Sequence, residues 1–134
     1  MRPLLVVDAA NVVGSVPDGW WRDRAGAARR LRDALAEVDA SGLPETGPEP
    51  EVVLVVEGAA RPVAGDPDGP DSVRVIAAPR SGDDTIIALV GASAGRPVVV
   101  VTADRALREA VSRRGATVIG PRSLPHLRRG PEPT

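Results

Sequence analysis

The sequence contains no cysteine, lysine, phenylalanine or tyrosine, and it has a single histidine, His126. Without cysteine the chain can form neither a disulfide framework nor a thiolate zinc site, and one histidine disfavours a zinc centre built on imidazoles. Any bound metal ion is therefore expected to be a hard cation held by oxygen atoms. His126 stands in a proline-rich segment, where we expect it to be structural or exposed rather than a general base.

Neither sign of charge predominates in the chain. Seventeen basic residues, all of them arginine, nearly balance eighteen acidic residues, and the net charge is −1. The chain is therefore not a polybasic nucleic-acid coat, although local arginine clusters would still suffice to contact phosphates. The first apolar run, Leu4–Val7, is too short for a signal peptide or a membrane span, so we expect a cytoplasmic protein without a membrane partner.

The length of 134 residues suits a single domain, in which roughly two thirds of the unfolded chain's surface can be buried. Hydrophobic residues make up 43% of the chain and are almost all Ala, Val, Leu and Ile, which predicts an aliphatic core. We expect one domain over residues 1–124 and a proline-rich C-terminal tail over residues 125–134.

Five short, β-branched apolar runs recur along the chain. They are continuously apolar rather than alternating, which is typical of a parallel sheet covered on both faces. In a doubly wound sheet with a central first strand, right-handed crossovers place the first and fourth strands side by side, with their carboxyl ends framing one crevice. The predicted strands are Leu4–Val7, Val52–Val56, Val73–Ala77, Val98–Val101 and Ala116–Ile119.

Helical periodicity predicts three helices. The second begins at Ser81 and has a nearly all-apolar body, which indicates deep burial, and the third spans about residues 103–114. The segment 58–71 is rich in Pro, Gly and Asp without periodicity, and it is predicted to be a surface loop with no crossover helix. The first helix ends near Ser41-Gly42, and its expected buried face comprises Trp21, Ala25, Ala28, Leu31, Leu35 and Val38.

Four aspartates follow predicted strands: Asp8, Asp83, Asp84 and Asp104. Each alone is explained about as well by a turn or a helix cap. Together they fall at the same edge of the sheet, where two carboxylates ~5 Å apart would repel by about 3 kcal/mol at an effective dielectric of about 20. Such a group needs a cation or raised pKa values, and Mg²⁺ or Mn²⁺ suits oxygen ligands. The chemistry indicated is metal-assisted attack of water on phosphorus.

Three segments in order resemble the NYN branch of the PIN-like ribonucleases, in particular its bacterial YacP-like members. Asp8-Ala9-Ala10-Asn11 is similar to the family's opening Asp-Gly-x-Asn segment, with Ala9 in place of the usual glycine. The segment 81–86 resembles the one that carries the family's middle aspartate, for which Asp84 is the better match and Asp83 an extra acid. The segment 102–107 resembles the Thr-Ser-Asp element after the fourth strand. The resemblance runs from about residue 3 to residue 124.

This resemblance implies a three-layer α/β/α fold with strand order 3-2-1-4-5 and cleavage of RNA phosphodiesters with Mg²⁺ or Mn²⁺. It implies that Asp8, Asp84 and Asp104 are metal ligands, with Asp83 as an additional acid of the metal site. Asn11 is implied to be a polar residue of the catalytic site. YacP-like members tend to have an aspartate where this chain has Glu57, which is either a further acid of the site or a strand-end charge.

Three residues are candidates for contacts with RNA. Arg80 and Arg105 stand next to candidate metal ligands, and Trp20 either stacks a base beside the site or caps the core. Further arginines could follow a phosphate backbone, although a charge-rich helix is more often a solvated face. They are Arg22, Arg24, Arg29, Arg30, Arg32 and Arg108.

Three functions remain open on the sequence. The first is a metal-dependent endoribonuclease acting on single-stranded or structured RNA, and the second is a phosphohydrolase of small nucleotides or phosphoesters. The third is a non-catalytic RNA-binding module on the same fold. A haloacid-dehalogenase mechanism is disfavoured because Asp8 lacks an aspartate two residues later and no lysine exists. Whether the chain acts as a monomer or a homodimer is also left open.

Overall fold

The computed structural model of the chain describes residues 2–124 and contains one five-stranded parallel sheet. The strand order is β3-β2-β1-β4-β5, so the predicted α/β class and order 3-2-1-4-5 are confirmed. His126 and the predicted tail over residues 125–134 lie outside the described residues. The strands are β1 Leu4–Asp8, β2 Glu51–Val56, β3 Val73–Ala77, β4 Val98–Val101 and β5 Thr117–Ile119.

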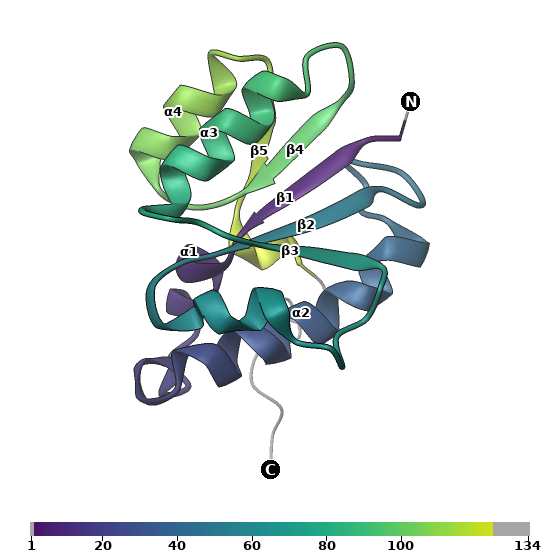
Figure 1. The fold of residues 1–134 in the computed structure, drawn as a ribbon. Coiled ribbons are helices and arrows are strands. Elements are labelled where there is room, and N and C mark those ends of the chain that lie inside the picture. Colours follow the sequence, from purple (N-terminus) through teal and green to yellow (C-terminus); the bar gives the residue numbers. More distant parts are fainter. Residues whose placement is uncertain (1, 125–134) are drawn as a thin grey trace.

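Helices cover both faces of this sheet and complete three layers (Figure 1). On one face lie α3 and α4, and on the other lie α1, α2 and the 3₁₀ helix η2. No helix in the described part of the chain combines the length and the apolarity that a bilayer crossing needs. The helices are α1 Ala9–Gly14, η1 Trp20–Arg22, α2 Arg24–Ser41, η2 Gly58–Gly65, α3 Gly82–Ala92, α4 Arg105–Ser112 and η3 Pro121–Ser123.

The strands are continuously apolar because both faces of the sheet are covered. Successive side chains of a strand point to opposite faces. Leu5 and Val7 accordingly pack in the core under α2, whereas Leu4 and Val6 pack in the core under α3 and α4. All four are at most 3% exposed. The central strands β1 and β4 therefore end at a rigid, buried edge, which positions whatever follows them.

Two local predictions are wrong, and one helix was not predicted. The residues after Asp8 form the helix α1, which Asp8 caps. Trp21 does not lie on the buried face of α2, because it belongs to the separate η1 and is 54% exposed. The segment after β2 is not a plain loop, since η2 runs through it and buries Ala60 and Val63 against the core. In each case a short helix with few apolar residues left no period that a sequence pattern could detect.

Helix α3 is less deeply buried than its composition indicates. Ile86 and Val90 are buried, whereas Ala88 on the opposite side is exposed. One face of an apolar helix thus remains at the surface.

Two arginines of α2 are engaged in ion pairs rather than free to contact phosphate. Arg29 and Arg32 each approach Asp66 to 2.7 Å, and Arg32 also pairs with Asp33 at 2.9 Å. The hydrogen bond from Arg29, followed by that from Arg32, holds the pKa of Asp66 below its usual value. The side chain of Arg32 is only 7% exposed. These contacts join α2 to the segment after η2.

Candidate active site

Asp8 is the buried acid at the end of β1. It is 4% exposed, and it caps the N-terminus of α1 because its Oδ1 accepts a hydrogen bond from the backbone N–H of Asn11 at 3.4 Å. Its Oδ2 accepts from the hydroxyl of Thr102 at 3.0 Å. Burial raises the pKa of Asp8 to about 6, although the bonds from Thr102 and Asn11 act in the opposite direction. The charges of Asp83 and Glu57 raise this pKa further.

Thr102 connects the acids at the ends of β1 and β4. It is completely buried, and its Oγ1 accepts a hydrogen bond from the backbone N–H of Asp104 at 3.1 Å while donating to Asp8. Asp104 in turn caps α4, with its Oδ1 accepting from the N–H of Leu107 at 2.9 Å. Thr102 belongs to the segment 102–107 that resembles the family's Thr-Ser-Asp element, which by itself predicts no role for the threonine. Its position between a buried strand and an aspartate was the available signal for a positioning role.

Asn11 links α1 to the segment that follows β4. Its Oδ1 accepts a hydrogen bond from the backbone N–H of Ala103 at 2.7 Å. A backbone N–H can only donate, so the side-chain atom of Asn11 that faces Ala103 must be the amide oxygen. The NH₂ group of Asn11 therefore remains available. Asn11 therefore offers the crevice a hydrogen-bond donor rather than another oxygen ligand.

The two adjacent aspartates of α3 differ in their surroundings. Asp83 is partly buried and Asp84 is exposed, and only the backbone N–H of Asp84 takes part in the cap, donating to Ser81 Oγ at 3.4 Å. Burial raises the pKa of Asp83, and the charges of Asp104, Glu57 and Asp84 raise it further. Asp83 also acts on Asp8, whereas Asp84 is not among the groups that shift the pKa of Asp8. The electrostatic coupling across the crevice thus runs through Asp83, although the resemblance favours Asp84.

Glu57 follows β2 and lies against the first turn of α3. A Cβ atom placed on Gly82 would be 3.0 Å from Glu57 Oε1, which puts this carboxylate beside the helix that carries Asp83. Its charge raises the pKa values of both Asp8 and Asp83. Glu57 therefore lies near the aspartates of the site, as a further carboxylate from the segment after β2.

Within residues 2–124, no three histidine, aspartate or glutamate side chains are grouped so that they could hold one metal ion. The three-aspartate cluster therefore stays a prediction. The donor set still fits a hard cation, because Mg²⁺ keeps several waters and is usually bound by only one or two protein carboxylates. Asp8 and Asp104, which share Thr102, and Asp83, which is coupled to both, are the residues present that could supply them.

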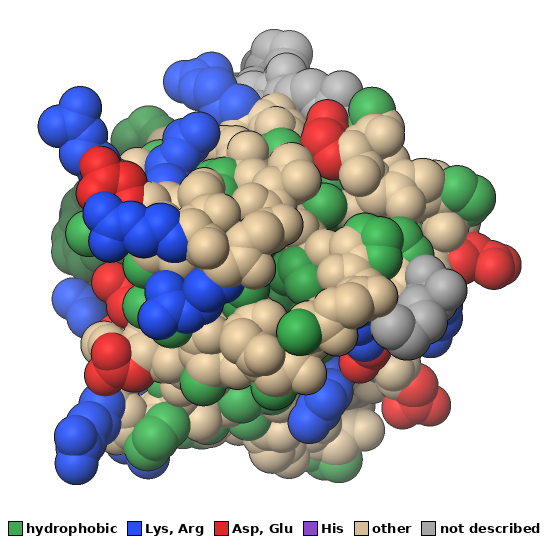
Figure 2. Space-filling model, turned by 90° about the horizontal axis from the view of Figure 1, so that it is seen from above, with side chains coloured by type: hydrophobic (Ala, Val, Ile, Leu, Met, Phe, Trp, Pro, Cys, Tyr) green, Lys and Arg blue, Asp and Glu red, His purple; other side chains and the backbone are tan. Residues whose placement is uncertain are grey.

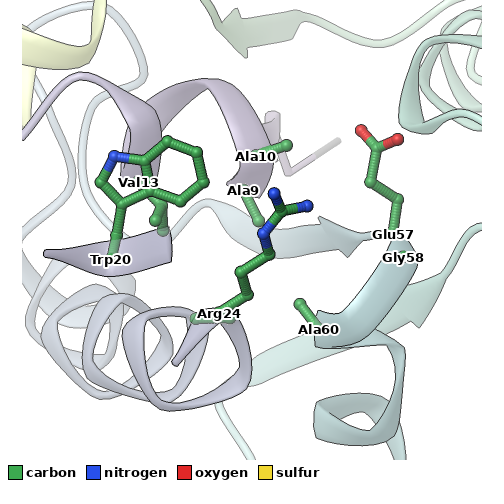
Figure 3. A pocket seen from close by; sticks show the side chains of 9 residues that line it. Ala9, Ala10, Val13, Trp20, Arg24, Glu57, Gly58 and Ala60 are labelled. Atoms are coloured by element: carbon green, nitrogen blue, oxygen red, sulfur yellow. The ribbon is translucent and has the colours of Figure 1, made fainter. Parts of the chain in front are cut away.

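A cleft opens next to these acids (Figure 3). It has a volume of about 250 Å³ and is lined by Trp20, Arg24 and Glu57 together with small apolar residues such as Ala9. Ala9, the departure from the family's glycine, is buried and fits within the first turn of α1. Trp20 belongs to neither core cluster and is only partly buried, so it is a wall of the cleft rather than a core residue.

Arg80 and Arg105 are both exposed beside the acids. Arg80 precedes the cap of α3, and Arg105 is the first residue of α4. Within the described residues neither makes a hydrogen bond or an ion pair from its side chain. Figure 2 shows basic side chains interspersed with acidic ones along one side of the face that it presents, not one continuous basic patch.

Comparison with known proteins supports the fold. The sequence matches no model of a known protein family and no curated protein. The structure is similar to the crystal structure of Rae1 (YacP) from Bacillus subtilis, with a TM-score of 0.74 and 22% identity, covering 94% of this chain and 72% of that one. A mutant of the same protein matches with a TM-score of 0.72 and 22% identity, over 96% of this chain and 74% of that one. The resemblance to YacP-like proteins is thus confirmed at the level of the fold.

Proposed function

We propose that this chain is a ribonuclease that hydrolyses RNA phosphodiester bonds with Mg²⁺ or Mn²⁺ at the carboxyl edge of its sheet. One observation carries the proposal: carboxylates from separate elements lie close enough that some of them raise the pKa values of others. The charges of Asp83 and Glu57 raise the pKa of Asp8, and the charges of Asp104 and Glu57 raise the pKa of Asp83. Unfavourable clustering of acids is common where a site binds a cation. The similarity in fold to Rae1 (YacP) supports RNA as the substrate class.

In this proposal one or two of the carboxylates of Asp8, Asp83 and Asp104 hold the cation together with water molecules, and Asp84 and Glu57 face it through solvent. The bound ion would supply the positive charge that activates a water molecule and stabilises the leaving oxygen. Thr102 fixes the relative positions of Asp8 and Asp104 through its two hydrogen bonds.

The remaining polar residues bind and orient the substrate. The free NH₂ group of Asn11 is the proposed donor to a phosphate oxygen, because its own oxygen is already bonded to Ala103. Arg80 and Arg105 are exposed cations close in sequence to Asp83 and Asp104, and they are the proposed contacts to neighbouring phosphates.

The test is incubation of the purified chain with a panel of single-stranded RNA, structured RNA and nucleotides, in Mn²⁺ and in EDTA. We expect cleavage of internal phosphodiesters that depends on Mn²⁺. Asp104→Asn should lower the cleavage rate at least about a hundredfold, because losses of this size follow when electrostatic stabilisation of the transition state is removed. The RNA affinity should change little. Asparagine is as good an N-cap as aspartate, so the variant should keep α4.

Arg105→Ala is the matched control next to Asp104, since it should weaken binding without abolishing turnover at saturating RNA. Release of phosphate from nucleotides without RNA cleavage would replace the proposal by a small-molecule phosphohydrolase. RNA binding without any cleavage, unchanged by Asp104→Asn, would replace it by a non-catalytic binding module.

A further inference from the structure

The cleft beside Glu57 is lined mainly by residues other than the acids. Its floor consists of small apolar side chains from three elements: Ala9 of α1, Ala28 of α2 and Ala60 of η2. The cleft measures about 250 Å³, below the roughly 300–1,000 Å³ of pockets for drug-sized ligands. A small cleft with apolar side chains in its lining has room for one planar ring.

Trp20 forms one wall of this cleft and is held in place from two sides. The ring of Trp21 packs edge-on against it, with centroids 6.0 Å apart and an interplanar angle of 89°. On the side of α1, a Cβ atom placed on Gly14 would lie 3.7 Å from Trp20 Cζ2. A fixed aromatic wall that is not part of the core is a platform on which an unpaired base can stack.

Arg24 is the cation of the cleft, and Figure 3 shows its guanidinium reaching between Trp20 and Glu57. Its Cζ lies 5.4 Å from the centroid of the Trp20 ring. Such a contact at an exposed site is weak, so a base can take the place beside Trp20 while Arg24 turns to an anion. Arg24 forms no ion pair with another of the described residues.

Glu57 lies at the border between the cleft and the acids, because it lines the cleft and also raises the pKa of Asp8. Ala9, in the floor, directly follows Asp8. A nucleotide seated in the cleft would therefore have its phosphate next to the carboxylates.

We propose that this cleft is a subsite for one unpaired nucleotide of single-stranded RNA, with its base against Trp20 and its phosphate near Arg24. The subsite rests on the proposed function, since it lies beside the carboxylates assigned to hydrolysis. Because stacking needs an exposed base face, the subsite accepts a single strand and excludes a base that is paired within a duplex.

Two tryptophans and no tyrosine make the test direct, since Trp21→Phe leaves Trp20 as the only indole. The Trp21→Phe protein is titrated with a single-stranded RNA hexamer in EDTA, and its fluorescence is followed. We expect quenching that saturates. The Trp20→Phe protein, which reports from the exposed Trp21, should show far less quenching with the same RNA. A matching duplex should quench neither protein.

Cleavage kinetics with Mn²⁺ provide the second readout. Trp20→Ala should raise KM about 5- to 100-fold, because it removes the stacking of one base, and kcat should be largely unchanged. Trp21→Phe, which keeps an aromatic ring against Trp20, is its control and should change neither constant. Arg24→Ala should lower the salt dependence of RNA binding by about one counterion, whereas Arg22→Ala, over the exposed Trp21, should not.

These outcomes separate the subsite from the nuclease proposal. Mn²⁺-dependent cleavage by the wild type, with no quenching of Trp20 and an unchanged KM in Trp20→Ala, overturns the subsite and leaves the nuclease. Quenching of Trp20 by the single strand without any cleavage supports the subsite and overturns the nuclease. Equal quenching by duplex and single strand also overturns the subsite.

Discussion

The hydrogen bond between Thr102 and Asp8 should control how the stability of the metal-free protein depends on pH. The pKa of Asp8 is raised from 3.8 to about 6, mainly by burial. The folded protein therefore binds more protons at this residue than the unfolded chain between these two values. Asp8 contributes stability that is fully present below pH 4 and is lost as the pH rises through 6. A shift of about two units corresponds to roughly 3 kcal/mol.

The perturbation is Thr102→Val, which removes the hydroxyl while keeping the shape of the side chain. Ionised Asp8 then keeps only the bond from the N–H of Asn11. A hydrogen bond to a charged group contributes about 1.5–3 kcal/mol, so we expect a loss of that size at pH 8. The loss should be clearly smaller at pH 4.5, where Asp8 is protonated in the folded state. The N–H of Asp104 also loses its acceptor, but that cost does not depend on pH.

The assay is urea unfolding in EDTA, followed by tryptophan fluorescence at several pH values from 4.5 to 8. Thr102→Ser is the control that restores the hydroxyl, and it should cost about the same at both ends of the range. Asp8→Asn should remove the fall in stability between pH 4 and 6 that the wild type shows. If Thr102→Val loses equal stability at pH 4.5 and pH 8, the hydrogen bond does not act on ionised Asp8 and the reasoning is refuted.

Other predictions address the acids and the ion pairs. Asp83→Asn should reduce Mn²⁺-dependent cleavage in single-turnover assays at least tenfold, and Asp84→Asn far less, because of these two aspartates it is Asp83 whose charge raises the pKa of Asp8. The reverse order would favour the family match. Saturating Mn²⁺ should raise the melting temperature, because at a hundredfold excess over Kd it raises the free energy of unfolding by about 2.7 kcal/mol, and Asp83→Asn should reduce that gain. Asp66→Asn should lower the urea midpoint because it removes a partner of the buried Arg32, whereas the exposed Asp68→Asn should not.

The strands could be predicted from the sequence because their signals are strong and local. Val98–Val101 and Leu4–Val7 are uninterrupted apolar runs, which are typical of a sheet covered on both faces. The handedness of crossovers places the first and fourth strands side by side when the first is central, and the family resemblance implies the full order 3-2-1-4-5, with which the observed order agrees. The placement of the acids after β1 and β4 follows directly from that order.

Other parts of the site could not be predicted, because they depend on contacts between residues far apart in the chain. Thr102 and Asp8 are 94 residues apart, and nothing near either residue indicates their hydrogen bond. The choice between Asp83 and Asp84 depends on how α3 is rotated against the sheet, which a helix with apolar residues on all sides does not determine. Helical spacing alone places Trp21 on α2, but that helix begins only after Asp23, which caps it.

Helix capping and participation in a metal site are compatible roles for the same aspartate. Asp8 and Asp104 each use Oδ1 to cap a helix, and the cap holds the carboxylate at the start of that helix. For Asp104 this leaves Oδ2 without a hydrogen bond from any of the described residues. A capped carboxylate is thus already oriented before a cation or a phosphate approaches, which reduces the entropy lost on binding. A helix cap is by itself a sufficient reason for Asp8 or Asp104 to stand where it does. In the proposed ribonuclease, the same caps also position these carboxylates to bind the metal ion.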